Sequence, residues 1–316
     1  MPKFITINNE KIGKGESKVV NMSSFKLPTR TIIDIPAYVY RSVNDGPVVL
    51  LMAGIHGDEI NGIEIIRQLI KCNYFENLLL GSVILVPVTN IISFISGTRA
   101  LPDGRDLNRC FPGSSSGSLG SRIAYDISKK ILPLIDFGID FHTGASGRTN
   151  YPQIRCKLSD NQNLKLAMMF GAPYILNSPF RDKSLRKEAA NQGKTILVFE
   201  GGEAARFDRN SINIGVEGTL RILGAYGMVS EKYFSLNPNE SIILQNSTWI
   251  RAKVAGLFQH KKQCGDKVSK KEVIGYITDP FGEKESKIVS TIDGFIIGMN
   301  NTPLVNKGDA IVNIAY

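Results

Sequence analysis

The stretch VVLLMAGIHGDEINGIEIIRQLIK, residues 48–71, decides the fold of this chain. Residues 48–55 form a continuous apolar run, as expected of a strand that is buried on both faces. After GIHGDE, isoleucines recur at helical spacing from Ile60 to Ile70, which predicts an amphipathic helix. A buried strand followed by a helix is typical of an α/β sheet, in which ligands bind beyond the carboxyl ends of the strands.

The alternation of strands and helices continues outward from this stretch. Residues 1–43 alternate polar and apolar residues and predict a few antiparallel strands before the Asn44–Pro47 turn. The patterns predict further strands at 82–88, 134–141 and 195–200, and helices at 118–132, 163–171, 185–193 and about 210–225. They indicate an α/β domain with a largely parallel or mixed central sheet flanked by helices.

The C-terminal part of the chain contains an internal repeat. Residues 268–277 and 305–314 both read Val-x-Lys-x-acid-x-Ile-x-x-Ile. Neither copy alone can bury its apolar face, so two copies imply a small pseudo-symmetric, all-β barrel. This barrel resembles the biotinyl/lipoyl-carrier fold, but GEKESK at 282–287 lacks the lysine between short apolar residues that a carrier presents. We therefore expect a non-carrier accessory domain that serves as a lid or as the contact of a homo-oligomer.

Length and composition exclude several classes of protein. The 316 residues suit one large domain and a small one, and we divide them at 1–43, 44–232 and 233–316. The net charge of +9 comes from scattered lysines without interleaved aromatic residues, so nucleic acid is not an expected partner. No apolar stretch is long enough for export or for a membrane span. The four widely spaced cysteines indicate free thiols, so we expect a cytoplasmic protein.

The chain has only three histidines, and two of them directly follow apolar strands. A lone histidine at a strand end is more often a hydrogen-bonded core residue than a ligand. Here, however, His56 lies in Gly-Ile-His-Gly-Asp-Glu with Glu59 three residues further on, and His142 directly follows the predicted strand 134–141. Imidazole and carboxylate are ligands that zinc prefers, and a catalytic site leaves one position open. We predict one Zn²⁺ on His56, Glu59 and His142.

Two more carboxylates fall at strand ends. Asp140 lies two residues before His142 and shares its strand face, so it is a candidate to accept the imidazole N–H, with a purely structural role as the alternative. Glu200 ends the strand 195–200 before two glycines and is the candidate general base for metal-activated water. Glu203 is the competing candidate and lies beyond the turn.

The loop that follows strand 82–88 offers groups that bind anions. An arginine fork matches a carboxylate, and an asparagine adds hydrogen bonds to it. We assign Asn108 and Arg109 to the carboxylate of a substrate and Arg99 to polarising the scissile carbonyl. Arg105 is the alternative to Arg99, and a surface loop of salt bridges is the alternative to a binding role.

Taken in order, GIHGDE, Thr98-Arg99, DLNRCFPG at 106–113, DFHTG at 140–144 and FEGG at 199–202 resemble the succinylglutamate desuccinylase/aspartoacylase family, which is related to zinc carboxypeptidases. The resemblance covers about residues 45–230, and the C-terminal barrel resembles the branch with N-acetyl-diaminobutyrate deacetylases. It implies the metal ligands, the base and the carboxylate site assigned above. The stretch between Arg99 and Asn108 is slightly longer than in aspartoacylases, so Arg99 and Arg105 both remain candidates.

Together with these patterns, the resemblance implies a zinc-dependent hydrolase that cleaves the amide bond of a small, anionic N-acylated amino acid. One alternative is a zinc carboxypeptidase that acts on peptide C-termini. A second alternative, from a different class, is a scaffold protein without catalysis. The complete set of candidate ligands and base favours an enzyme.

Overall fold

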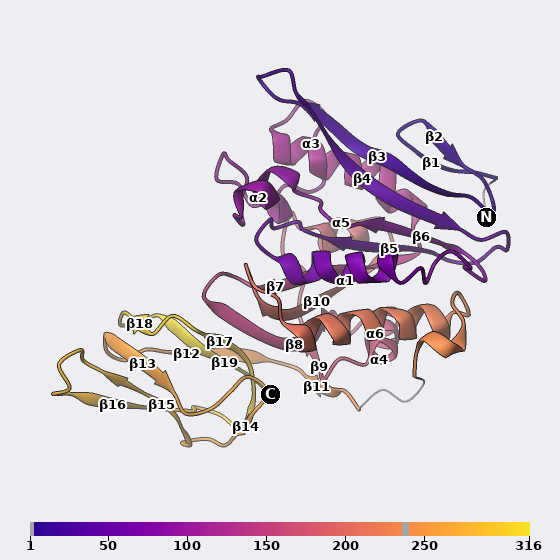
Figure 1. The fold of residues 1–316 in the computed structure, drawn as a ribbon. Coiled ribbons are helices and arrows are strands. Elements are labelled where there is room, and N and C mark those ends of the chain that lie inside the picture. The colour runs from indigo at the N-terminus through magenta and orange to yellow at the C-terminus, as the bar shows by residue number, and fades with distance from the viewer. Residues whose placement is uncertain (1–2, 236–239) are drawn as a thin grey trace.

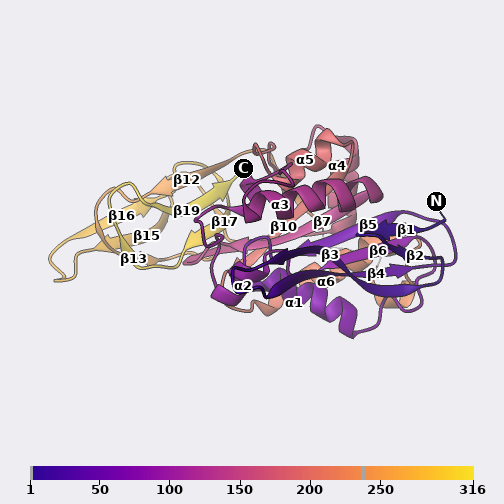
Figure 2. The same cartoon turned by 90° about the horizontal axis from the view of Figure 1, so that it is seen from above.

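The computed structural model describes residues 3–235 and 240–316, so residues 1–2 of the predicted N-terminal segment and residues 236–239 lie outside it. Figures 1 and 2 show an elongated molecule with the N-terminal strands at one end and the C-terminal strands at the other. Among the residues that the structure describes, no helix is both long enough and apolar enough to cross a bilayer.

The first 244 residues contain the α/β part. Its strands are β1 (Ile5–Ile7), β2 (Glu10–Ile12), β3 (Ser17–Lys26), β4 (Ile32–Arg41), β5 (Val48–Ala53), β6 (Ser82–Val86), β7 (Phe137–Gly144), β8 (Arg148–Cys156), β9 (Tyr174–Asn177), β10 (Thr195–Glu203) and β11 (Ile242–Leu244). Its α-helices are α1 (Ile60–Lys71), α2 (Ile91–Ser96), α3 (Leu119–Asp126), α4 (Asn161–Phe170), α5 (Leu185–Asn191) and α6 (Arg209–Ala225).

The C-terminal part is built from strands alone. They are β12 (Ser247–Arg251), β13 (Gly256–His260), β14 (Lys267–Val268), β15 (Val273–Thr278), β16 (Glu285–Val289), β17 (Gly294–Asn300), β18 (Leu304–Val305) and β19 (Ala310–Ala315). The fold class expected from the sequence, a mixed central sheet with flanking helices and a C-terminal β unit, is confirmed.

The central sheet is mixed, and its buried strands carry the site. In the described ranges it holds 13 strands, and its main path is β12-β19-β17-β8-β10-β7-β5-β6-β4-β3. Strands β5, β7 and β10 run parallel to one another, so their carboxyl ends meet at one edge. One face is covered by α1, α4 and α6 and the other by α3 and α5, which explains why every residue of β5 is buried. This is the burial that its unbroken apolar run predicts.

Helix α1 packs on the sheet through a face that its isoleucine spacing only partly indicates. Ile65, Ile66 and Leu69 are fully buried, whereas Ile60 and Ile70 at the ends of the predicted stripe are only half-buried. Gly62 brings the helix close to the sheet, since a Cβ there would lie 2.6 Å from the Cβ of Phe141. The buried face of α1 therefore points towards β7, the strand that carries His142.

The predicted helix 118–132 is interrupted. Helix α3 ends at Asp126 and continues as a π-helical turn, Ile127–Ile131, and a 3-10 turn, Leu132–Leu134. Pro133 lies in the 3-10 turn, and proline has no N–H for the hydrogen bond that would continue an α-helix. The helix predicted at 118–132 is therefore present, but only its first part, up to Asp126, is α-helical.

The C-terminal part has two equivalent halves, and each copy of the internal repeat supplies one strand to each half: β14 and β15 come from one copy, and β18 and β19 from the other. One half is the antiparallel sheet β16-β15-β13-β18, and the other is formed by β12, β19, β17 and β14. Val305 pairs with Gly256 in one half, as Val268 pairs with Gly294 in the other. Side chains of both halves share one apolar core, which includes Phe258. Each copy of the repeat thus buries its apolar face against the other.

The two parts of the molecule are joined by backbone pairing. Strand β17 pairs with β8, with Gly298 opposite Asn150, and β11 pairs with β9. The hydrogen-bonded sheet therefore runs across the boundary drawn between residues 232 and 233. The division into three domains, and an oligomer contact through the C-terminal strands, stay predictions.

Candidate active site

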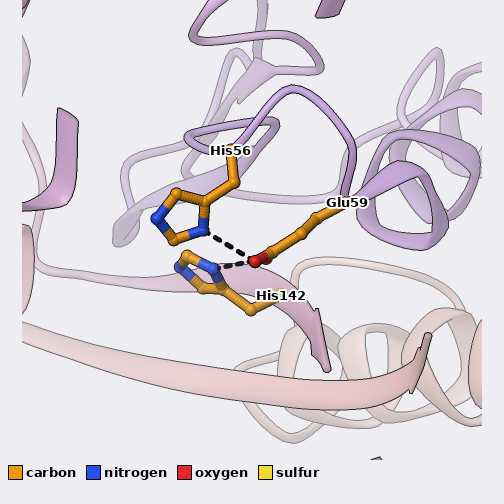
Figure 3. Close-up of side chains that lie close together, drawn as sticks. All are labelled: His56, Glu59 and His142. Atoms are coloured by element: carbon orange, nitrogen blue, oxygen red, sulfur yellow. Dashed lines mark hydrogen bonds and ion pairs between the residues drawn. The ribbon is translucent and has the colours of Figure 1, made fainter. Parts of the chain in front are cut away.

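Two histidines and a glutamate converge where the parallel strands end (Figure 3). His56 and Glu59 lie in the turn between β5 and α1, and His142 lies near the end of β7. All three are buried, and one candidate ligand atom of each lies within 4.8 Å of the others. Zinc bonds such atoms at about 2 Å, so the three side chains would move closer together around one ion.

Glu59 stands between the two imidazoles. Its Oε1 lies 2.8 Å from His56 Nδ1, and its Oε2 lies 2.7 Å from His142 Nδ1. Within the described ranges His56 Nδ1 is buried and has no aligned hydrogen-bond partner, even though Glu59 is close. A buried imidazole nitrogen without a hydrogen-bond partner is available to bind a metal. Two imidazoles and one carboxylate are the donor set of a catalytic zinc site. These residues therefore fit a metal ion.

The outer nitrogen of each imidazole faces an aspartate. His142 Nε2 lies 2.8 Å from Asp140 Oδ2, and His56 Nε2 lies 3.0 Å from Asp106 Oδ1. A proton on Nε2, donated to these carboxylates, leaves the Nδ1 lone pairs on the side of Glu59. Asp140 is the partner that the sequence predicts for His142, whereas Asp106 was not predicted, although it stands in the same short motif as Asn108.

The charges of the cluster are strongly coupled. Burial opposes ionisation of Glu59, but the His56 and His142 imidazoles outweigh it and hold the pKa of Glu59 well below its ordinary value. Burial also favours neutral His142, yet Asp140 and Glu59 raise the pKa of His142 well above its ordinary value. The carboxylates around the two imidazoles thus favour positive charge at this position, which protons or a bound cation can supply.

The turn that carries His56 and Glu59 needs a glycine at position 57 for steric reasons. A Cβ on Gly57 would lie only 2.0 Å from the carbonyl carbon of Ser93 on α2. Any side chain at this position would push the turn away from α2 and displace His56, its neighbour. The glycine next to the first candidate ligand therefore permits the close approach that the sequence pattern suggested.

Glu200 lines the same cavity as the histidines. It lies on β10 directly opposite His142 on β7, and its Oε2 accepts a 2.8 Å hydrogen bond from Asn150 Nδ2. Arg155 Nη1 lies 3.6 Å from its Oε1. Glu203 instead accepts hydrogen bonds from the Gly147 N–H and from Asn301 and does not line the cavity.

The loop for which the sequence predicts anion binding also reaches the cavity. Arg99, Asn108 and Arg109 line it, whereas Arg105 does not and pairs with Asp103 at 3.6 Å. Arg99 lies closest to the candidate ligands, because its Nη1 donates to Glu59 Oε1 at 2.7 Å. The side-chain oxygen of Asn108 accepts from the Leu185 N–H, which leaves the amide NH₂ of Asn108 for a ligand.

The cavity has a volume of about 490 Å³ and is lined by many cationic side chains. Arg186 among them donates to the carbonyls of Arg155, Ser178 and Pro179, and its burial lowers its pKa to about 10. The six arginines that line the cavity are Arg99, Arg109, Arg148, Arg155, Arg181 and Arg186. Such a lining favours an anionic ligand.

Several lining residues were missed by sequence reasoning. Asn150 and Arg155 lie on β8, a strand that the sequence analysis did not assign. Trp249 and Asn313 come from the C-terminal strands β12 and β19. No local motif marks these four residues, since each reaches the cavity only through the pairing of distant strands.

Comparison with known proteins relates the chain to one family. Residues 45–226 match the family described as "Succinylglutamate desuccinylase/Aspartoacylase catalytic domain". The N-alpha-acetyl-L-2,4-diaminobutyric acid deacetylase of Halomonas elongata is 30% identical over 89% of this chain and 85% of that protein.

Two solved structures share the fold. A succinylglutamate desuccinylase/aspartoacylase from Rhodobacter sphaeroides aligns with a TM-score of 0.82 and 25% identity over 95% of this chain and 94% of its own. The ectoine utilization protein EutE from Ruegeria pomeroyi, in a product-bound form, has a TM-score of 0.82 and 22% identity over 92% of each chain. The likeness extends over the C-terminal strands as well as the α/β part.

Proposed function

Because this chain belongs to the succinylglutamate desuccinylase/aspartoacylase family, we propose that it is a zinc-dependent hydrolase that cleaves the amide bond of a small N-acylated amino acid. The observation that carries the proposal is the buried set of His56, Glu59 and His142 at the end of a cavity rich in arginine. The four free cysteines suit a reducing compartment, which supports a cytoplasmic location.

Different residues of this chain would serve different steps of such a reaction. Zinc, when bound, supplies a Lewis acid and lowers the pKa of a coordinated water towards about 7. His56, Glu59 and His142 would hold it, and the aspartates behind the histidines would keep both imidazoles in the binding tautomer. The fit of these donors, and not the fold alone, supports zinc as the metal.

Glu200 is the proposed general base, and the arginines orient the substrate. Glu200 would take the proton of the attacking water and pass it to the leaving amine. Arg99 stands beside Glu59, where it can stabilise the oxyanion that develops on the scissile carbonyl. Asn108 and Arg109 would bind the substrate carboxylate through the free amide NH₂ and the guanidinium fork.

The substrate is proposed to be a small N-acylated amino acid with a free carboxylate. Its anionic character suits the arginine lining. The Halomonas relative is named for deacetylation of an N-acetylated diamino acid, which supports the same class of reaction here. A carboxypeptidase would place a peptide C-terminus in the same carboxylate site, so dipeptides belong in the substrate panel as the competing class.

Variants of the candidate base and of one ligand test the proposal. Glu200→Gln should retain zinc and lose about 10²- to 10⁴-fold in kcat on N-acetyl amino acids, the usual contribution of a general base. His142→Ala should lose the metal as well, as measured by metal analysis of the purified protein. Glu203→Gln is the matched control, because Glu203 does not line the cavity and the amide oxygen of glutamine can keep one of the two hydrogen bonds from Gly147 and Asn301. Full turnover in Glu200→Gln would contradict the assignment, and faster cleavage of dipeptides would indicate a carboxypeptidase.

A further inference from the structure

The cavity wall that the C-terminal strands supply contains a buried side chain without a partner. Asn313 on β19 lines the cavity and is 5% exposed. Its Oδ1 has no hydrogen-bond donor among the residues that the structure describes. A buried carbonyl oxygen is rarely left unpaired in a protein, because its desolvation is not compensated. A ligand in the cavity can supply the missing donor.

Asn313 belongs to a row of residues that crosses four strands on one face of the sheet. Gly298 on β17 lies opposite both Asn150 on β8 and Asn313, and Asn313 lies opposite Trp249 on β12. Residues that face each other across antiparallel strands present their side chains to the same side. Asn150, Asn313 and Trp249 all line the cavity, as this geometry requires.

Gly298 separates the two asparagines without a side chain of its own. A Cβ at this position would lie 3.0 Å from Asn150 Oδ1 and 3.5 Å from the Cβ of Asn313. Any larger side chain would stand between the two amides. The glycine therefore leaves the two amides without a protein side chain between them.

The two ends of the row are fixed by different contacts. At the catalytic end, Asn150 Nδ2 donates to Glu200 Oε2 at 2.8 Å. At the far end, the Arg148 guanidinium stacks over the ring of Trp249 at 5.2 Å. The row thus runs from Asn150, next to the proposed base Glu200, to the C-terminal strands. Asn313 lies within the cavity, and Gly298 lies between it and the Glu200 end of the row.

We propose that Asn313 determines specificity, and that its Oδ1 accepts a hydrogen bond from the side chain of the substrate's amino acid. This inference rests on the proposed deacylase function. The acetyl and succinyl groups named in the relatives carry no N–H or O–H at neutral pH, so the acyl group cannot satisfy Oδ1. An ammonium, amide or hydroxyl group on the amino acid can do so. The C-terminal strands thereby select a substrate with a hydrogen-bond donor in its side chain.

A panel of substrates with one acyl group tests this proposal. In their side chains, the Nα-acetyl derivatives of 2,4-diaminobutyrate, glutamine and homoserine offer an ammonium, an amide and a hydroxyl donor, whereas the side chain of Nα-acetylnorvaline offers none. Asn313→Leu keeps the size of the side chain and removes the acceptor. It should lower kcat/KM about 10- to 100-fold for the donor-bearing substrate that the wild type prefers, and by less than about 3-fold for Nα-acetylnorvaline. Asn306→Ala is the control, because Asn306 is exposed in the turn between β18 and β19.

Two kinetic results would overturn the proposal. One is an equal loss in Asn313→Leu on Nα-acetylnorvaline and on the preferred donor-bearing substrate, which indicates a structural role or a hydrogen bond to the amide N–H that all the substrates share. The other is a wild-type enzyme that cleaves Nα-acetylnorvaline as well as every donor-bearing substrate. Among the three donor-bearing substrates, the largest loss in Asn313→Leu identifies the chemical group that Asn313 binds.

A binding measurement tests the role of Asn313 independently of the proposed reaction. The melting temperature of the zinc-loaded protein is measured with free 2,4-diaminobutyrate, glutamine, homoserine or norvaline, and no turnover is needed. At least one donor-bearing amino acid should stabilise the wild type more than norvaline does, and Asn313→Leu should remove the difference. If this holds while no N-acetyl amino acid is cleaved, the assignment of Asn313 stands and the proposed reaction fails. Equal stabilisation of wild type and Asn313→Leu by every amino acid overturns the assignment.

Discussion

Replacement of Asp140 should weaken metal binding although Asp140 is not a ligand. If Nδ1 of His142 binds the metal, Nε2 carries the proton and donates it to Asp140 at 2.8 Å. Both side chains are nearly inaccessible, at 6% and 2% exposure, so water cannot take the place of the carboxylate. Asp140→Ala would leave a buried N–H unpaired, at a cost of about 1–3 kcal/mol.

This cost sets the size of the expected effect. At about 1.4 kcal/mol for each tenfold change, it corresponds to a zinc affinity about 5- to 150-fold weaker. Losses of about 10- to 100-fold are usual for such outer partners of metal ligands, which agrees with that range. Asp106→Ala should have a smaller effect, because its hydrogen bond to His56 is 3.0 Å long and its side chain is 24% exposed. Water can replace the Asp106 carboxylate in part.

Zinc titration against a competing colorimetric chelator measures both variants. Asp140→Asn should fall between Asp140→Ala and wild type, since its amide oxygen can still accept from Nε2 but carries no full charge. Asp34→Ala is the control, because Asp34 lies on β4 and accepts a hydrogen bond from Ser24 away from the cavity. Thermal melts establish that each variant is folded. Zinc affinity in Asp140→Ala within about twofold of wild type would refute the placement of the metal on His142 Nδ1.

Two predictions concern the core and the thiols. Phe199→Ala should lower the free energy of unfolding by about 3–5 kcal/mol in denaturant titrations, because the ring is fully buried, and a loss below about 1 kcal/mol would contradict this packing. Burial raises the pKa of Cys156 to about 11 and that of Cys264 to about 12, so both stay protonated thiols at pH 8, and a thiol reagent should modify the exposed Cys72 first. Rapid labelling of Cys156 or Cys264 in the folded protein, located by mass spectrometry, would count against the predicted order.

The features that the sequence predicted are those with a local signature. The apolar run at 48–55 and the strand end at His142 follow from hydrophobic patterning, and the ligand spacing from His56 to Glu59 lies within one turn. Strand β8 escaped prediction because Arg148–Cys156 mixes polar residues with Pro152 and shows no regular alternation. Arg148, Asn150 and Arg155 of this strand line the cavity, so polar residues stand where a buried strand is usually apolar.

The rest of the site depends on contacts between distant segments. Nothing near Asn313 in the sequence indicates that it lies in the same cavity as His56, 257 positions earlier. The repeat predicted that the C-terminal strands form one unit, but the pairing of β17 with β8 brings that unit to the cavity. Pairing of this kind is decided by packing over the whole fold, and no short window of sequence contains it.

The pairing of β8 with β17 also bears on how the protein behaves when shortened. A chain cut after residue 232 would lack both β17 and β11, and β8 and β9 would each lose a neighbour. Their free N–H and C=O groups would then form an uncovered border that can recruit strands of other molecules. The C-terminal strands therefore cover edges that would otherwise promote self-association. A fragment that ends at residue 232 should precipitate at concentrations at which the whole chain stays in solution.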